Sequence, residues 1–321
     1  MIPADWAAGP MSGADAGDVT AVVNAAQHQW GRGDQFTREE LVSLLDSPSV
    51  RPERDGRLLR DGDGHLVAGV LVVTTGPWTT AHLHASVPDH PRRRVALQWA
   101  VDTGLAIAAN RDELLAAAVV DADGVAEEDR LMGEVLAERG FAQVRRICEM
   151  TIDLADGAVD GGAAPLPEGV HLEALPTDDA AQLAELAEVN ARAFADHDGD
   201  FGMTTEDFVH FVRDTPSVRS DLSAVAVQDD RPVALALVMA DTSDPERRTG
   251  YVGIVSVVRE ARGRGLARAL LQESFRRFRT EGWTRARLHV QVGNRTGADR
   301  LYRSVGMEPG AVDVSWSRPL G

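Results

Sequence analysis

The hydrophobic and polar positions of this chain follow the same order of elements twice. In the second half, residues 170–175 alternate as in a strand, and Asp178 or Asp179 then caps a helix whose apolar residues recur at helical spacing. Thr204 opens a second helix, with Asp207 placed as in a capping box. The remaining elements are expected as a hairpin of 223–227 with 233–239, a strand at 251–258, a helix at 266–280, a strand at 285–292, a helix at 296–304, and two closing strands around Met307 and at 312–316.

The first half repeats this outline. Helices follow strands in both halves, while hairpins make part of each sheet antiparallel. The sequence therefore predicts an α/β (α+β) fold of two similar domains, each a mixed, mostly antiparallel sheet flanked by helices. In the first half we expect strands at 69–74, 81–87, 114–120 and 146–154, and helices at 93–110 and 127–139, the second helix ending at Gly140-Phe141.

A segment rich in Gly, Ala and Pro, 155–169, separates the two halves and has no periodic apolar pattern. We therefore place the domains at 18–154 and 168–321, joined by a linker at 155–167. Residues 1–18 lack the basic and apolar regions of a secretory signal, and their composition predicts a mobile leader.

Composition excludes several classes of function. The 321 residues carry a formal net charge of -17, which argues against nucleic acid, because nucleic-acid binding depends on neutralised phosphates. The same charge suits a cationic substrate through long-range steering, or serves only to keep the protein in solution. No apolar run approaches the ~18 residues of a membrane span. Cys148, the one cysteine, is expected to be a buried hydrophobe. We expect a cytoplasmic protein, either monomeric or homodimeric.

No metal site is expected. His82 and His84 share one face of a predicted strand, but neither a cysteine nor a third ligand accompanies them.

The strongest candidate for chemistry is a loop between a strand and a helix, Arg262-Gly263-Arg264-Gly265-Leu266-Ala267. Its glycines permit backbone conformations and close approaches that a Cβ would block. The first turn of the following helix offers unpaired N–H groups and the positive end of the helix dipole, so it suits a pyrophosphate. Arginines at the mouth add positive charge. By itself, such a loop is also what a tight turn with solvated arginines would look like.

A second motif lies further along the chain: 294–298, followed by Leu301-Tyr302 and then Gly306-Met307. Together the two motifs resemble the GNAT superfamily of N-acetyltransferases, whose acyl-CoA loop reads Q/R-x-x-G-x-G/A. The resemblance covers about 168–321, and the doubled layout extends it to a tandem GNAT protein similar to the mycothiol synthases.

The resemblance implies an acyltransferase that uses acetyl-CoA as co-substrate and forms no covalent enzyme intermediate. The pantetheine arm would follow the backbone of 255–257, and Tyr302 would protonate the leaving thiolate. A phenol of pKa ~10 near a thiol of pKa ~8.5 suits that role, although a core aromatic beside Leu301 is the plain alternative. The residues expected at the cofactor are Val255, Ser256, Val257, Arg262, Gly263, Arg264, Gly265, Leu266, Ala267, Asn294 and Ala298.

The first half lacks the same motifs. When the halves are aligned at the strands before the loop, 92–97 lies opposite 262–267, and Val95 takes the place of Gly265. In the same way Leu136 lies opposite Tyr302. The first half is therefore expected to be a scaffold that no longer binds the cofactor as the second half does.

The general base is not settled by the sequence. A lysine-like amine must lose a proton before it attacks, which costs about 4.6 kcal/mol at pH 7, against about 1.4 for an α-amine. Many relatives carry a glutamate early on the strand before the loop, where this chain has Thr249-Gly250-Tyr251. Three candidates remain: His289, the cluster Asp196-His197-Asp198, and Tyr251 through a water.

The preferred function is an N-acetyltransferase of a small amine, such as an aminosugar, an antibiotic or a thiol precursor. Two alternatives stay open: a protein or peptide N-acetyltransferase, and a non-catalytic CoA-binding or interaction protein.

Overall fold

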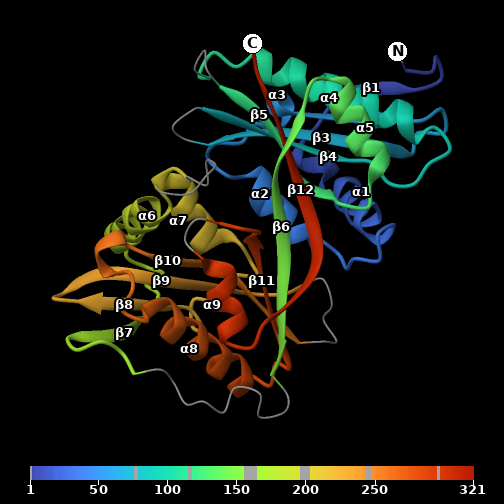
Figure 1. Ribbon diagram of the computed structural model, residues 1–321. Helices are drawn as coiled ribbons and strands as arrows, with labels where there is room; N and C mark the ends of the chain where they lie inside the picture. Colours follow the sequence, from blue (N-terminus) through green and yellow to red (C-terminus); the bar gives the residue numbers. More distant parts are fainter. Residues whose placement is uncertain are drawn as a thin grey trace. The chain divides into compact units, whose positions relative to one another are not determined.

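The computed structural model describes residues 2–75, 79–114, 118–154, 165–195, 203–242, 248–294 and 297–321 (Figure 1). The chain divides into two compact units, one of Met1–Ile147 with Val312–Gly321 and one of Cys148–Ala311. The divisions fall within two long strands, β6 (Ala142–Asp153) and β12 (Glu308–Pro319), whose residues are shared between the units. The linker expected at 155–167 stays a prediction, because 155–164 lie outside the described residues.

The N-terminal unit contains strands in the order β1-β2-β3-β4-β5-β12. Neighbours whose register is known run antiparallel, except β4 and β5, which are parallel because helix α4 crosses between them. Its elements are β1 (Ala7–Pro10), α1 (Ala16–His28), α2 (Arg38–Leu45), α3 (Pro52–Asp55), β2 (Gly56–Arg60), β3 (Leu66–Thr75), β4 (Thr80–Ser86), α4 (Arg93–Ala109), β5 (Val119–Ala126) and α5 (Arg130–Glu138).

The C-terminal unit repeats the arrangement with strands in the order β6-β11-β10-β9-β8-β7. Here β10 and β11 are the parallel pair, joined through helix α8. Both units are therefore mixed, mostly antiparallel sheets with helices, as the sequence predicts. The elements are β7 (Val170–Ala174), α6 (Ala180–Phe194), α7 (Thr205–Asp214), β8 (Ala224–Gln228), β9 (Arg231–Ala240), β10 (Thr249–Val257), α8 (Leu266–Thr280), β11 (Arg285–Gln291) and α9 (Ala298–Ser304).

In each unit the long helix lies close against the parallel strands. A Cβ added to Gly250 of β10 would come within 2.4 Å of the Phe278 ring of α8. In the N-terminal unit the glycine is on the helix instead, and a Cβ at Gly104 would come within 2.5 Å of Leu83 on β4. A side chain in either place would push the helix away from the sheet, so both glycines are needed for packing.

The mobile leader expected at residues 1–18 is wrong. Residues 7–10 form β1, which pairs with β2, and Ser12 and Asp15 form a capping box ahead of α1. Met11 is buried against Gly56, where a Cβ would lie 2.8 Å from it. The composition misleads because small residues also suit an edge strand held by backbone pairing.

Two strands also differ from expectation. The strand expected at 114–120 is β5, Val119–Ala126; its Asp-Ala-Asp-Gly sequence looks like a turn, but Asp121 and Asp123 meet Arg145 and His82, partners far away in sequence. The two closing strands are a single one, β12, with a register shift between Val314 and Trp316.

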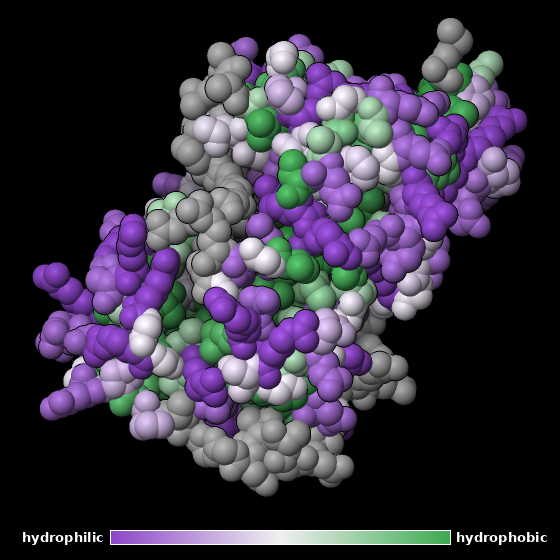
Figure 2. Space-filling view, in the orientation of Figure 1, coloured by the Kyte–Doolittle hydropathy of each residue, from purple (hydrophilic) through white to green (hydrophobic). Residues whose placement is uncertain are grey.

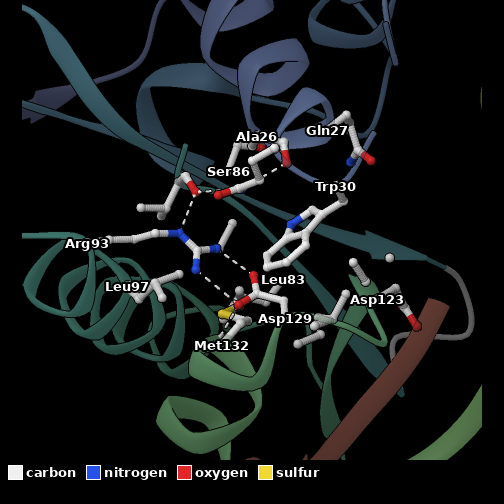
Figure 3. A pocket seen from close by; sticks show the side chains of 17 residues that line it. Ala26, Gln27, Trp30, Leu83, Ser86, Arg93, Leu97, Asp123, Asp129 and Met132 are labelled. Carbon is white, nitrogen blue, oxygen red and sulfur yellow. Dashed lines mark hydrogen bonds and ion pairs between the residues drawn. The ribbon is translucent and has the colours of Figure 1, made fainter. Parts of the chain in front are cut away.

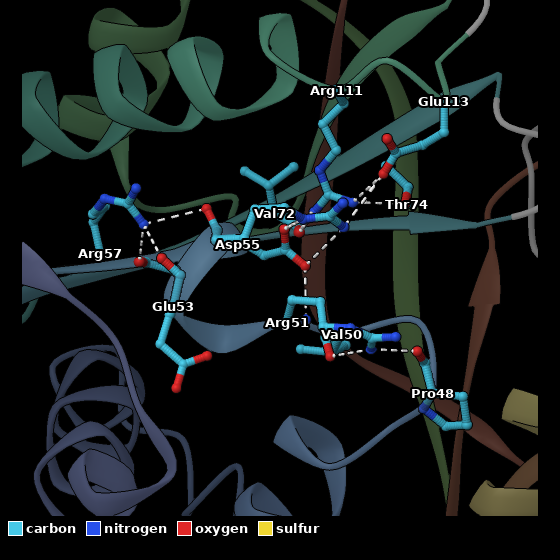
Figure 4. Close-up of polar contacts among 12 residues, drawn as sticks. Pro48, Val50, Arg51, Glu53, Asp55, Arg57, Val72, Thr74, Arg111 and Glu113 are labelled. Atoms are coloured by element: carbon cyan, nitrogen blue, oxygen red, sulfur yellow. Dashed lines mark hydrogen bonds and ion pairs between the residues drawn. The ribbon is translucent and has the colours of Figure 1, made fainter.

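A buried ion pair anchors α3 to the rest of the N-terminal unit (Figure 4). Arg111 and Asp55 have side chains 2% and 1% exposed and lie 3.0 Å apart. Arg111 also donates to the Thr74 hydroxyl and to the Val72 carbonyl. Since an unpaired charge is very unfavourable in such a place, loss of Asp55 is expected to destabilise this unit, even with Glu113 3.3 Å from Arg111.

On the face shown in Figure 2, hydrophilic residues cover most of the surface, and apolar residues appear in small groups between them. Among the described residues, no helix has the length and apolar character to cross a membrane.

Candidate active site

Strands β10 and β11 part in the middle of the C-terminal unit. Their register runs from the pair Thr249–Arg285 to the pair Tyr251–Arg287. Beyond this point β10 stays paired with β9 only, and a bulge falls between Val252 and Ile254. One edge of β10 therefore faces away from its paired strand, and unpaired backbone groups on such an edge can hydrogen-bond an extended ligand.

The loop 262–265 leads from this strand to α8. Gly263 and Gly265 have φ angles of +75° and +87°, and a Cβ on either would touch nothing within 4 Å. No side chain caps the N-terminus of α8, which is also true of α1 and α4; what distinguishes α8 is the pair of open glycines that precedes it. The first-turn amides and the open glycine backbone are thus arranged for an anion.

Three arginines near this loop have different contacts. Arg262 donates from Nε to the Val257 carbonyl at 3.1 Å and from a terminal nitrogen to the Ala193 carbonyl at 2.8 Å, so its side chain holds the loop against β10 and α6. Arg264 is exposed and contacts Gln228 at 2.6 Å. Arg268 contacts the Ser304 hydroxyl at 2.7 Å.

The strand residues expected along the pantetheine arm are less free than the sequence suggests. Ser256 is 2% exposed and its buried hydroxyl has no partner, so its side chain points into the core. The carbonyl of Val257 already accepts from Arg262. Leu266 is likewise a core residue, 1% exposed, so a ligand would meet its backbone alone.

The chain has two tyrosines, and both lie in the C-terminal unit. Tyr251 on β10 lies with its hydroxyl 3.1 Å from His289 Nδ1 on β11. Burial raises the pKa of Tyr302 on α9 to about 12, and the charge of Tyr251 adds to the shift. Burial also raises the pKa of Tyr251. Both phenols therefore stay protonated near neutral pH and act as hydrogen-bond donors.

A charged cluster that sequence reasoning missed lies beside the tyrosines. Arg287 on β11 donates to Glu149 at 3.1 Å and to Asp241 at 2.9 Å, and its guanidinium carbon is 5.2 Å from the centre of the Tyr251 ring. Glu149 lies on β6, Asp241 follows the end of β9, and Arg287 lies on β11, so the three charged residues are far apart in sequence. Nothing local in the sequence marks them as neighbours.

Other expected site residues have mainly structural contacts. The side-chain oxygen of Asn294 accepts from the Ala298 N–H at 3.0 Å and so caps α9. Cys148 is buried, as predicted. His197, with Asp196 and Asp198, lies outside the described residues.

The N-terminal unit shows what the same framework looks like without these groups. The ends of α5 and α9 make the same backbone bonds: Phe141 N–H to the Leu136 carbonyl at 3.1 Å, and Met307 N–H to the Tyr302 carbonyl at 3.1 Å. Leu136 therefore occupies the position of Tyr302. Helix α4 begins already at Arg93, so residues aligned with the glycine loop are helical there.

A small pocket of about 50 Å³ marks the place where β4 and β5 part (Figure 3). Arg93 lies at its side, ion-paired with Asp129 and donating to the Val87 carbonyl at 3.2 Å. Trp30, just after α1, also lines it, with the Arg93 guanidinium 5.8 Å from the ring centre. Arg93 thus makes with Val87 the contact that Arg262 makes with Val257.

The N-terminal unit also contains a cluster that the sequence did not reveal as a possible metal site. Ligand atoms of His82, Asp121 and Asp123 lie within 4.8 Å of one another. Arg145, however, is 2.6 Å from Asp121 and 3.4 Å from Asp123, and His82 is 2.9 Å from Asp123. A guanidinium already neutralises the carboxylates, so this cluster is explained as an ion-pair network.

Comparison with known proteins agrees with this geometry. Residues 184–307 match the acetyltransferase (GNAT) family. The chain is 34% identical over 185 residues to a mycothiol acetyltransferase of Beutenbergia cavernae, an alignment that spans 56% of this chain and 61% of that protein. It is 29% identical over 312 residues to a mycothiol acetyltransferase of Nocardia farcinica, spanning 94% and 98%.

Solved structures share the fold over the whole chain. A GCN5-related N-acetyltransferase from Sphaerobacter thermophilus superimposes with a TM-score of 0.76 at 24% identity, covering 100% of this chain and 97% of that one. A tandem GNAT protein from the clavulanic acid biosynthesis pathway gives 0.72 at 18% identity, covering 98% and 99%. Residues 184–307 are thus an acetyltransferase (GNAT) domain, and the whole chain has the fold of solved tandem GNAT proteins.

Proposed function

We propose that this protein transfers the acetyl group of acetyl-CoA to a primary amine of a small molecule, through direct attack in a ternary complex. The observation that carries the proposal is the open backbone of Gly263 and Gly265 ahead of the uncapped N-terminus of α8, in the same unit as Tyr302 and the Tyr251–His289 pair. The names of the sequence relatives favour an amine of the thiol-precursor type over an aminosugar or an antibiotic.

Different residues would bind the cofactor and take part in the reaction. Backbone amides at the start of α8, with Gly263 and Gly265, would hold the pyrophosphate, and the free edge of β10 would hold the pantetheine arm. The neutral amine attacks the thioester carbonyl, a C–N bond forms and the C–S bond breaks. Tyr302 donates a hydrogen bond to the sulfur as its negative charge develops, and a phenol with a pKa of about 12 keeps its proton for this purpose.

The amine proton must leave before attack. The Tyr251–His289 pair lies where the paired strands part, and an imidazole is suited to accept a proton near neutral pH. His197 remains the other candidate base. A carboxylate base of the kind many relatives place early on this strand is absent from positions 249–251, which favours an acceptor whose amine has a low pKa.

The test is amine-dependent conversion of acetyl-CoA to CoA, followed by chromatographic separation of the two, because an amine of the thiol-precursor type can carry a thiol of its own that would react with a thiol reagent. The chain has no lysine, so acetylation of its own side-chain amines cannot mimic turnover. We expect release with a cysteinyl or aminosugar amine. Release with basic peptides alone would favour the peptide acetyltransferase, and binding of acetyl-CoA without release by any amine would favour the non-catalytic protein.

A further inference from the structure

Arg287 is held from two sides in the middle of the C-terminal unit. Its guanidinium donates to Glu149 on β6 at 3.1 Å and to Asp241 after β9 at 2.9 Å. The Asp241 side chain is 5% exposed, and those of Arg287 and Glu149 are about a quarter exposed. Two carboxylates with good geometry fix a planar guanidinium firmly, since both ends of its fork are engaged.

The face of this guanidinium meets the Tyr251 ring, with 5.2 Å between the guanidinium carbon and the ring centre. Tyr251 and Arg287 are also the last residues in register before β10 and β11 part. The Tyr251 hydroxyl also reaches His289 Nδ1 at 3.1 Å, and the two rings meet edge to face. The fixed charge, the phenol and the exposed imidazole thus form one connected row.

We propose that Arg287 is a positioning residue, which holds Tyr251, and through it His289, in the place where the acceptor amine gives up its proton. This inference rests on the function proposed above, because it assigns a task within that reaction. Arg287 touches neither substrate in this scheme. Arg287 acts on the reaction only by orienting Tyr251 and His289 and by changing how strongly these two side chains bind a proton.

The N-terminal unit provides an internal comparison. On the same strand positions it has His82, Asp121 and Asp123, with Arg145 against Asp121 at 2.6 Å. His82 lies 2.9 Å from Asp123, as Tyr251 lies 3.1 Å from His289. An ion pair at this place is therefore common to both units, whereas the aromatic ring on the guanidinium belongs to the unit with the open loop. That difference is what assigns Arg287 a task beyond folding.

The charges around Tyr251 give the direction of the effect. Burial raises the pKa of Tyr251, Arg287 lowers it, and Asp241 and Glu149 raise it; the hydroxyl of Tyr302 and the ring of His289 are its other ionisable neighbours. Removing the positive charge leaves two carboxylates beside the pair. They favour the protonated form of both rings, so the base accepts its substrate proton only at higher pH.

The kinetic test compares Arg287→Gln and Arg287→Lys with Arg145→Gln, the matched change in the N-terminal unit. We expect Arg287→Gln to lower kcat about tenfold and to move the acid limb of the pH profile up by about one unit, with the affinity for acetyl-CoA within about twofold of the parent. Arg287→Lys should have the same pH profile as the parent protein and a lower kcat. Arg145→Gln should lower the melting temperature without moving the profile. If Arg287→Gln behaves like Arg145→Gln, the inference is wrong.

A second readout does not depend on turnover. In a Tyr302→Phe background Tyr251 is the one tyrosine of the chain, so its ionisation can be followed by ultraviolet difference absorption. Adding Arg287→Gln should raise the midpoint by about one pH unit, and an unchanged midpoint overturns the inference. If no amine stimulates the parent protein, the proposed function fails, yet this titration still decides whether Arg287 acts on Tyr251.

Discussion

Leu136 of the N-terminal unit and Tyr302 of the C-terminal unit occupy the same position at the ends of equivalent helices. Each carbonyl accepts an N–H from the residue five positions later, at 3.1 Å in both units. Leu136 is 0% exposed and packs in the core, while Tyr302 brings a hydroxyl to its site. One framework thus has a hydroxyl donor in one unit and an apolar side chain in the other.

We predict that the chain binds one acetyl-CoA. In the N-terminal unit Arg93 starts α4 where the C-terminal unit has the glycine loop, and the Arg93–Asp129 pair lines a pocket of about 50 Å³, far smaller than a pantetheine arm needs. Calorimetry should give a stoichiometry near one. A stoichiometry near two would show that the N-terminal unit opens for a second cofactor.

Gly265→Val should weaken acetyl-CoA binding by at least tenfold. The φ of +87° strains a β-branched residue by about 1–2 kcal/mol, and the new side chain stands where the pyrophosphate approaches the backbone. Gly64→Val is the matched control, because Gly64 has a φ of +84° in a turn of the N-terminal unit and an equally open side. It should lose similar stability and keep its affinity; equal affinities for the two variants would contradict the loop assignment.

Tyr302→Phe should lower kcat about 10²-fold and leave acetyl-CoA affinity unchanged. The ring stays, so packing on α9 is kept, and the loss reports the hydroxyl alone. Tyr251→Phe serves for comparison, since it should alter the pH profile together with kcat. Unchanged turnover in Tyr302→Phe would remove this residue from the reaction.

The raised pKa of Tyr302 also predicts how stability depends on pH. Its folded pKa of about 12 lies above the unfolded value of ~10. The unfolded chain therefore loses this proton first as the pH rises. The contribution of Tyr302 to the free energy of unfolding is full below pH ~10 and is lost as pH rises toward 12. In urea unfolding at intervals from pH 8 to 11, the free energy of unfolding should fall as the pH rises, and it should fall less in Tyr302→Phe than in the parent protein. Parallel curves for the two proteins would refute the shift.

The cofactor loop could be predicted from the sequence because its signals are local. Two glycines needed for positive φ, followed at once by a helix, describe the same short segment that would meet the anion. The role of Arg262 could not be read in this way, since its side chain reaches the Ala193 carbonyl 69 residues earlier. The same holds for Arg287, whose partners are Glu149 on β6 and Asp241 just after β9.

Strand β5 shows the converse difficulty. Its acidic residues and Gly124, with a φ of +68°, have the local chemistry of a turn, and the sequence-based strand was placed five residues too early. Pairing with β4 and β12, together with the contacts of Arg145 and His82, overrides that local preference. Tertiary partners of this kind leave no local pattern in the sequence.

Asp55→Asn should destabilise the protein by about 3 kcal/mol, because it takes from the buried Arg111 its nearest charge partner and leaves the more exposed Glu113, 3.3 Å away, to balance the guanidinium. The pair is 3.0 Å apart with both side chains at most 2% exposed, and Asp55 also accepts from the Arg51 N–H at 2.8 Å. Asp5→Asn is the control: it breaks the exposed Asp5–Arg92 pair, 3.4 Å apart, and should cost less than about 1 kcal/mol. Urea unfolding of both variants measures the difference. If Asp55→Asn unfolds like Asp5→Asn, the buried pair does not anchor α3 and another contact must hold the N-terminal unit together.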